Sequence, residues 1–161
     1  SFPTRRSSDL LPKTVDGLII QSKNELSEAE QQQMHFPVYD GINYNRSGSY
    51  PVGQCTWYVY NRFKQLGTSV DEFMGNGSDW GRKGRALGYQ VSSLPKAGRA
   101  ISFQPGVAGA DNQYGHVAFV EAVTSDGIII SESNVINDQT ISYRVLPNVI
   151  AYSSGVTYIG A

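Results

Sequence analysis

Apolar positions at helical spacing predict one helix in the first half of the chain. Val59, Phe63 and Leu66 follow Cys55 at intervals of three or four residues, which places them on one face of a helix. Gly67 comes directly afterwards and supplies a C-terminal stop. We therefore predict a helix of about three turns that begins at Cys55, with the thiol in its first turn.

Two further helices are indicated by the residues at their starts. Ser27 and Glu30 have the spacing of a capping box, in which a serine is followed three residues later by a glutamate. They open a short polar helix. Ser78 or Asp79 can cap another helix over 80–87.

The second half of the chain changes to short apolar runs separated by turn residues. A tight turn is expected at 125–127, where Ser-Asp-Gly lies between two such runs. The run at 18–20 is either a further strand or the remnant of a preceding region. We predict antiparallel strands at 100–103, 116–123, 128–132, 140–145 and 156–159. Helices followed by an antiparallel sheet give an α+β layout.

The composition describes a globular, loop-rich chain with little charge. Of its 161 residues, 17% are charged and 40% are hydrophobic, and the net charge is −1. Such a chain lacks the positive charge with which nucleic-acid binders neutralise phosphates, so we expect no nucleic-acid partner. No apolar run approaches the roughly 20 residues that a membrane-spanning helix needs.

Residues 1–10 (SFPTRRSSDL) are similar to the conceptual translation of a widely used DNA sequencing adapter. We interpret them as a scar and exclude them from reasoning about the fold. On this interpretation the natural N-terminus is missing, so the absence of a signal peptide does not argue for a cytoplasmic protein.

The single cysteine lies at a position where its thiolate form is stabilised. In the first turn of a helix, unpaired backbone N–H groups and the positive end of the helix dipole stabilise an anion. The thiol of Cys55 is therefore shifted toward the thiolate, which is the form that attacks carbonyl groups. Considered alone, a lone cysteine is equally compatible with a small buried apolar residue.

The predicted hairpin brings a base and a carboxylate to the same region. His116 begins one strand and Glu132 ends the strand that returns beside it, so antiparallel pairing places both at one rim of the sheet. A histidine oriented by a carboxylate is the base that a thiol nucleophile needs. Asn134 could replace or assist Glu132 as the orienting group. Each residue alone is compatible with an ordinary solvated strand end, but with Cys55 they point to a cysteine-nucleophile site.

Four motifs carry a resemblance to the CHAP family, the cysteine, histidine-dependent amidohydrolases/peptidases. The resemblance extends over about 45–159, and the order and separation of the motifs agree with the family. Its motifs are the nucleophile segment 50–59 (YPVGQCTWYV), the intervening segment 75–80 (GNGSDW), the histidine segment 115–121 (GHVAFVE) and the third segment 131–134 (SESN).

The resemblance implies a papain-like α+β fold and cleavage of amide bonds in peptidoglycan. Members act as endopeptidases on the stem peptide or cross-bridge, or as N-acetylmuramoyl-L-alanine amidases. By position, Cys55 matches the family's nucleophile and His116 its general base. Glu132 matches the residue that orients the histidine, and Asn134 the nearby amide sometimes given that role. Either the Gln54 side chain or the backbone N–H of Cys55 is expected to form the oxyanion hole.

Three aromatic residues near these motifs are candidates for the walls of a substrate groove. They are Trp57, Tyr58 and Tyr114, and each is equally compatible with packing in the core or at the rim. Some phage members of the family carry an aspartate-rich calcium loop before the cysteine, which the segment 40–50 lacks. We therefore expect no metal ion and no cofactor.

The resemblance also sets the expected organisation and location. We expect 11–44 to be an N-terminal segment or linker and 45–161 to be the catalytic domain. An enzyme that acts on peptidoglycan is expected to be secreted or bound at the cell surface, and we expect a monomer. Two alternatives stay open, a secreted thiol protease or amidase on protein substrates and a catalytically idle wall-binding module.

Overall fold

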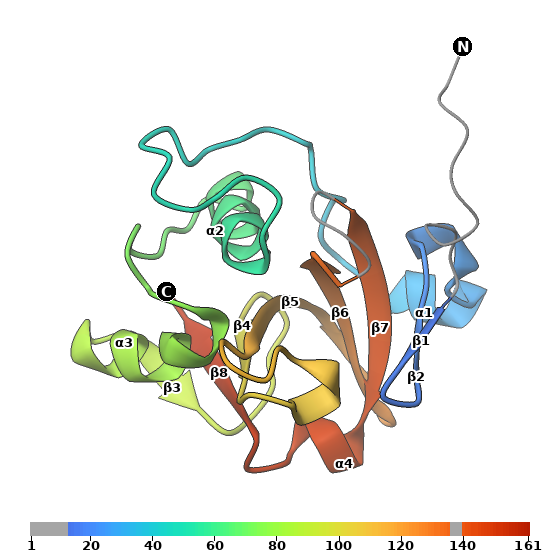
Figure 1. Ribbon diagram of the computed structural model, residues 1–161. Coiled ribbons are helices and arrows are strands. Elements are labelled where there is room, and N and C mark those ends of the chain that lie inside the picture. The colour runs from blue at the N-terminus through green and yellow to red at the C-terminus, as the bar shows by residue number, and fades with distance from the viewer. Residues whose placement is uncertain (1–12, 136–139) are drawn as a thin grey trace.

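A six-stranded antiparallel sheet forms the centre of the molecule (Figure 1). The computed structural model describes residues 13–135 and 140–161, so the proposed adapter scar at 1–10 lies outside the described residues. The strands lie in the order β3-β8-β4-β5-β6-β7. Their bounds are Gln90–Ser92 for β3, Ala100–Phe103 for β4, His116–Val123 for β5, Gly127–Ser133 for β6, Ile141–Pro147 for β7 and Val156–Gly160 for β8.

The helices lie where the sequence predicts them. The long helix α2 (Cys55–Gln65) packs on one face of the sheet, over β5 and β6 (Figure 1). Helix α3 (Trp80–Ala86) contacts β3 and β8. Helix α1 (Glu28–Gln33) begins with the predicted capping box, in which the Ser27 hydroxyl accepts from the backbone N–H of Glu30 at 3.0 Å. The α+β class is confirmed, while the one-turn helix α4 (Asn148–Ala151) had no signal that predicted it.

Both faces of the central strands are buried, which explains the continuous apolar runs. The side chains of Ile128, Ile129 and Ile130 have no exposed surface. Ile128 and Ile130 belong to the cluster on the face that α4 covers, whereas Ile129 packs with Leu26 of the N-terminal segment. An uninterrupted apolar run is what a strand covered on both sides requires.

Part of the N-terminal segment packs against the sheet. Strands β1 (Lys13–Val15) and β2 (Leu18–Ile20) form a hairpin, of which only β2 had been considered from the sequence. The backbone of Gln21 then pairs with Tyr143 of β7 through two hydrogen bonds of 3.0 and 2.8 Å. A membrane crossing would need a longer and more apolar helix than any in the described part of the chain.

Strands β5 and β6 are interrupted by one extra residue. Val120 lies opposite Ile130, whereas Ala122 lies opposite Ile129, so Glu121 between them has no partner in the ladder. This arrangement is a β-bulge, which shifts the register of the pair by one position.

The bulge decides which side chains of the hairpin share a face. Beyond it, Phe119 lies opposite Ser131, and with this register His116 and Glu132 lie on the same face. If the same residues paired regularly from Ala122 and Ile129 onward, without the bulge, Glu132 would lie opposite Phe119, whose side chain points to the other face. A one-residue slip would therefore separate the two side chains.

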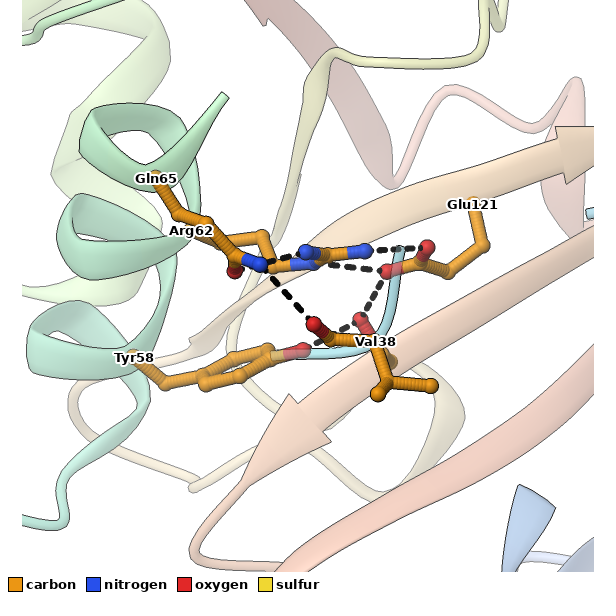
Figure 2. A network of polar contacts seen from close by, with 6 residues as sticks. Val38, Tyr58, Arg62, Gln65 and Glu121 are labelled. Carbon is orange, nitrogen blue, oxygen red and sulfur yellow. Dashed lines mark hydrogen bonds and ion pairs between the residues drawn. The ribbon is translucent and has the colours of Figure 1, made fainter. Parts of the chain in front are cut away.

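A buried polar network attaches the bulge to α2, as Figure 2 shows. Arg62 donates from Nε and Nη2 to the two carboxylate oxygens of Glu121, at 3.0 and 2.8 Å. Ser131 of β6 donates to the same carboxylate at 2.7 Å and accepts from the Tyr58 hydroxyl at 2.7 Å. The Arg62 and Glu121 side chains are 1% and 3% exposed. If either residue lost its charge, water could not reach the other charge to solvate it.

We predict that Glu121→Gln lowers the free energy of unfolding by about 3–5 kcal/mol, because it leaves the buried Arg62 charge uncompensated. Urea denaturation followed by circular dichroism measures this change. The control is Arg82→Gln, which removes a solvent-exposed ion pair with Asp79 and should cost less than about 1 kcal/mol. Equal stabilities of the two variants would contradict the structural role of the network.

Candidate active site

Cys55 is the first residue of α2 and is half-buried. The chain enters the helix through Gly53, whose φ of 87° is a conformation that favours glycine. The carbonyl oxygen of Gly53 accepts a hydrogen bond from Ser133 of β6 at 2.6 Å. The turn that presents the thiol is therefore attached to the end of the sheet.

His116 and Glu132 meet on one face of the β5–β6 hairpin. The imidazole Nε2 of His116 donates to Oε1 of Glu132 at 2.9 Å, and both side chains are buried. This contact leaves Nδ1 as the imidazole nitrogen available to the Cys55 thiol. The sheet thus brings together the three residues that the sequence singled out.

Arg144 of β7 holds Glu132 from the other side, and sequence reasoning missed it. Its Nε and Nη2 bind the two carboxylate oxygens of Glu132, the latter at 2.9 Å. Its Nη1 donates at 2.6 Å to the carbonyl oxygen of Ala108, a residue with the left-handed φ of 53°. The one available signal was a charged residue at an inward position of a strand, which demands a buried partner of opposite charge.

The protonation of the site is set by these contacts. Burial alone raises the pKa of the Cys55 thiol, but the hydrogen bond with His116 and those from the backbone N–H groups of Val117 and Thr56 bring it below its ordinary value. Burial lowers the pKa of His116, but its hydrogen bonds with Cys55 and Glu132 raise that pKa to about 9. Each group therefore favours the charged form of the other, a thiolate beside an imidazolium.

Glu132 stays ionised despite having no exposed surface. Burial raises the pKa of its carboxyl group, but the Arg144 guanidinium and the His116 imidazolium outweigh that effect and hold the pKa below its usual range. A negative charge beside His116 in turn stabilises the protonated imidazole.

Two glycines allow the intervening segment to approach the histidine. A Cβ atom on Gly77 would lie 2.4 Å from the backbone carbonyl carbon of His116, and one on Gly115 would lie 2.3 Å from the carbonyl oxygen of Phe103. The carbonyl oxygen of Gly77 also accepts from the buried Ser102 hydroxyl at 2.6 Å. The backbone of 75–80 therefore fixes the position of His116.

Asn134 contacts the residue before the cysteine. It adopts a left-handed φ of 63°, and its side-chain nitrogen donates to Oε1 of Gln54 at 2.8 Å. Asn134 therefore binds the candidate oxyanion residue, whereas Nε2 of His116 donates its hydrogen bond to Glu132.

A cavity of about 510 Å³ opens at the thiol. Cys55 and His116 line it together with Gln54, Asn134 and Tyr114. Tyr114 is 49% exposed, and its role as a wall for substrate stays a prediction. Val15 of the N-terminal hairpin also lines the cavity, a contribution that nothing in the sequence indicated.

The other two aromatic candidates are not groove walls. Tyr58 has no exposed surface, and its hydroxyl belongs to the network around Glu121. Trp57 is 7% exposed and donates from its indole nitrogen to Asn43 at 3.0 Å. Neither residue lines the cavity, because the first turn of α2 buries both of them in the hydrophobic core.

No set of ligands for a metal ion is found in the described part of the chain. Within residues 13–135 and 140–161, no three His, Cys, Asp or Glu side chains gather closely enough to bind one.

The sequence model of the CHAP domain matches residues 45–134. An N-acetylmuramoyl-L-alanine amidase domain-containing protein of Staphylococcus aureus is 54% identical over 98 residues, 60% of this chain and 16% of that protein. The probable autolysin SsaALP of the same species is 36% identical over 107 residues, 65% of this chain and 38% of that protein. A putative hydrolase of Streptococcus mutans is 38% identical over 115 residues, 69% of this chain and 50% of that protein. The chain thus spans at most half of each of these relatives.

A solved structure shares the fold. The crystal structure of an N-acetylmuramoyl-L-alanine amidase from Staphylococcus aureus matches with a TM-score of 0.72 at 41% sequence identity. The match covers 86% of this chain and 38% of that chain.

We predict that Cys55 reacts with iodoacetamide well below the ordinary pKa of a thiol, because its lowered pKa keeps the thiolate present there. In His116→Gln the thiolate loses its counterion, so the rate at pH 7 should fall about tenfold or more. Alkylation rates from pH 5 to 10, followed by mass spectrometry, test this. Identical pH profiles of the wild type and the variant would contradict the ion pair.

Proposed function

The chain belongs to the CHAP domain family, and from this premise we propose that it is a peptidoglycan hydrolase that cleaves an amide bond through Cys55. The observation that carries the proposal is that the Cys55 thiol and the His116 imidazole line one cavity, while the buried Glu132 carboxylate binds the imidazole from the side away from the thiol. This is the set of groups that a cysteine nucleophile needs.

In the proposed mechanism the thiolate of Cys55 attacks the carbonyl carbon of the amide. The negative charge that develops on the carbonyl oxygen is stabilised by the backbone N–H of Cys55 and by the side-chain amide of Gln54, each donor contributing about 3 kcal/mol. Because Asn134 binds Oε1 of Gln54, the Gln54 amide nitrogen is the end left to donate.

His116 then moves the protons. Its imidazolium gives a proton to the amine as the carbon–nitrogen bond breaks, which leaves a thioester on Cys55. The neutral imidazole next takes a proton from water, which attacks the thioester and releases the acid. Glu132 holds the imidazole in position throughout and stabilises its charged form.

Two bond types are compatible with this mechanism. The amidase reaction cuts between the lactyl group of muramic acid and L-alanine, and the endopeptidase reaction cuts within the stem peptide or cross-bridge. The names of the Staphylococcus aureus relatives, an amidase domain-containing protein and a crystallised amidase, favour the amidase reaction. The proposed location is outside the cell, secreted or at the cell surface, where this substrate lies.

A thiol protease or amidase acting on proteins is the alternative enzyme. It has the same site chemistry, so only the substrate separates it from the proposed hydrolase. Purified peptidoglycan fragments and casein, offered in parallel and analysed by mass spectrometry, distinguish them. An idle wall-binding module is disfavoured because its cysteine would not require an imidazolium partner.

We predict that Cys55→Ala and His116→Gln reduce the clearing of cell walls by at least about a thousandfold, because each removes a reacting group. Zymograms and turbidity of wall suspensions measure clearing, and mass spectrometry of the products identifies the bond. His35→Gln is the matched control, since His35 is exposed and outside the cavity lining. Undiminished clearing by Cys55→Ala would overturn the proposed mechanism.

We also predict a positioning role for Arg144. Arg144→Lys keeps a positive charge but loses the paired hydrogen bonds to Glu132, and Arg144→Gln loses the charge as well. We expect kcat to fall about tenfold or more in both. In Arg144→Gln the pKa of Glu132 rises, so Glu132 becomes protonated at higher pH and the acid limb of the kcat profile moves to higher pH.

A shift of the acid limb of the kcat–pH profile in Arg144→Gln distinguishes a positioning role of Arg144 from a general loss of folding. A purely structural effect would lower kcat by the same factor at every pH. Arg85→Gln, an exposed change on α3, is the control and should reproduce the wild-type profile.

A further inference from the structure

A second hollow continues from the catalytic cavity. It has a volume of about 310 Å³. Pro51, Thr56 and Asn76 line both the hollow and the catalytic cavity, so the two depressions share a boundary directly beside Cys55. A substrate that is cleaved in the middle extends from the thiol on both sides of the scissile bond. The catalytic cavity can hold one side, and this hollow can hold the other.

The hollow contains two opposite charges that form no ion pair with the described residues. Lys83 of α3 and Glu72 both line it and are both half-buried. Neither takes part in an ion pair within the described residues. The one polar contact of the Glu72 carboxylate is a long hydrogen bond of 3.5 Å from the Tyr60 hydroxyl. Half-buried charges that are not compensated by the protein are suited to pairing with a ligand.

An aromatic ring borders the same hollow. Phe73 is 71% exposed although it is a large apolar side chain. Its backbone is held in place, since its N–H donates to the Asp71 carboxylate at 2.8 Å. An exposed ring beside two charges offers apolar contact to the aliphatic part of a ligand.

We propose that this hollow is a substrate subsite for a peptide segment that bears a free carboxylate. The carboxylate pairs with the Lys83 ammonium, an amine or amide N–H of the same segment donates to Glu72, and the aliphatic part of the segment lies on Phe73. The subsite rests on the proposed function for its substrate class, since peptidoglycan stem peptides carry both free carboxylates and amines.

The test uses two synthetic stem peptides that differ in one group, a carboxylate in the first and a carboxamide in the second. The dissociation constants of both are measured in the Cys55→Ala background, so that binding is seen without turnover. We expect the carboxylate peptide to bind about tenfold more tightly. Lys83→Gln should abolish this preference, and Lys83→Glu should reverse it.

Two controls show that the charge at position 83 is responsible. Arg85→Gln removes a positive charge from the same helix, outside both depressions, and should keep the wild-type preference. The alkylation rate of Cys55 in the Lys83 variants should equal that of the wild type, which shows that the catalytic residues are undisturbed.

The outcomes separate this subsite from the proposed function. A preference for the carboxylate peptide that depends on Lys83 supports the subsite, whether or not the wild type cleaves the peptides. If the wild type cleaves neither peptide, the proposed hydrolase activity is contradicted and the subsite is not. If both peptides bind equally, or if Lys83→Gln weakens both by the same factor, the subsite is overturned while wall hydrolysis can stand.

Discussion

The register of one β-hairpin is the constraint on which the site depends. The β-bulge at Glu121 places His116 and Glu132 on the same face of the sheet, and a regular ladder of the same residues would place them on opposite faces. The bulge is held by the buried ion pair between Arg62 and Glu121. Because Arg62 belongs to the helix that begins at Cys55, one interaction couples the position of the proposed nucleophile to the position of its proposed base.

A second buried ion pair controls charge at the site. Arg144 keeps Glu132 ionised in a region without solvent, and the ionised carboxylate supports the imidazolium of His116. The thiolate of Cys55 is stabilised by that imidazolium and by backbone N–H groups. The two buried pairs therefore have distinct roles, since the first sets geometry and the second sets protonation. Buried pairs of this kind are costly to desolvate, which is consistent with a role in positioning the site.

Local signals in the sequence predicted helices α1, α2 and α3 and strands β4 to β8, whereas α4, β1 and β3 were not predicted. The spacing after Cys55 predicted α2, and the turn before Gly127 predicted the hairpin that carries His116. The bulge, the role of Arg144 and the burial of Tyr58 could not be predicted, because each depends on contacts between residues distant in the sequence. Arg144 lies 12 residues from Glu132 in the chain. The alternating pattern of its strand was visible in the sequence, but the sequence did not show that this strand pairs with β6.

The most direct test of this account is the titration of His116 by NMR in protein labelled with ¹⁵N at histidine. The chain has two histidines, so His35→Gln assigns the signals without ambiguity. The account predicts that the imidazole of His116 stays protonated at pH 7.5 and loses its proton near pH 9, in accord with its raised pKa. An imidazole that is neutral at pH 7.5 and titrates near the ordinary value of about 6.5 would contradict the ion pair with Cys55.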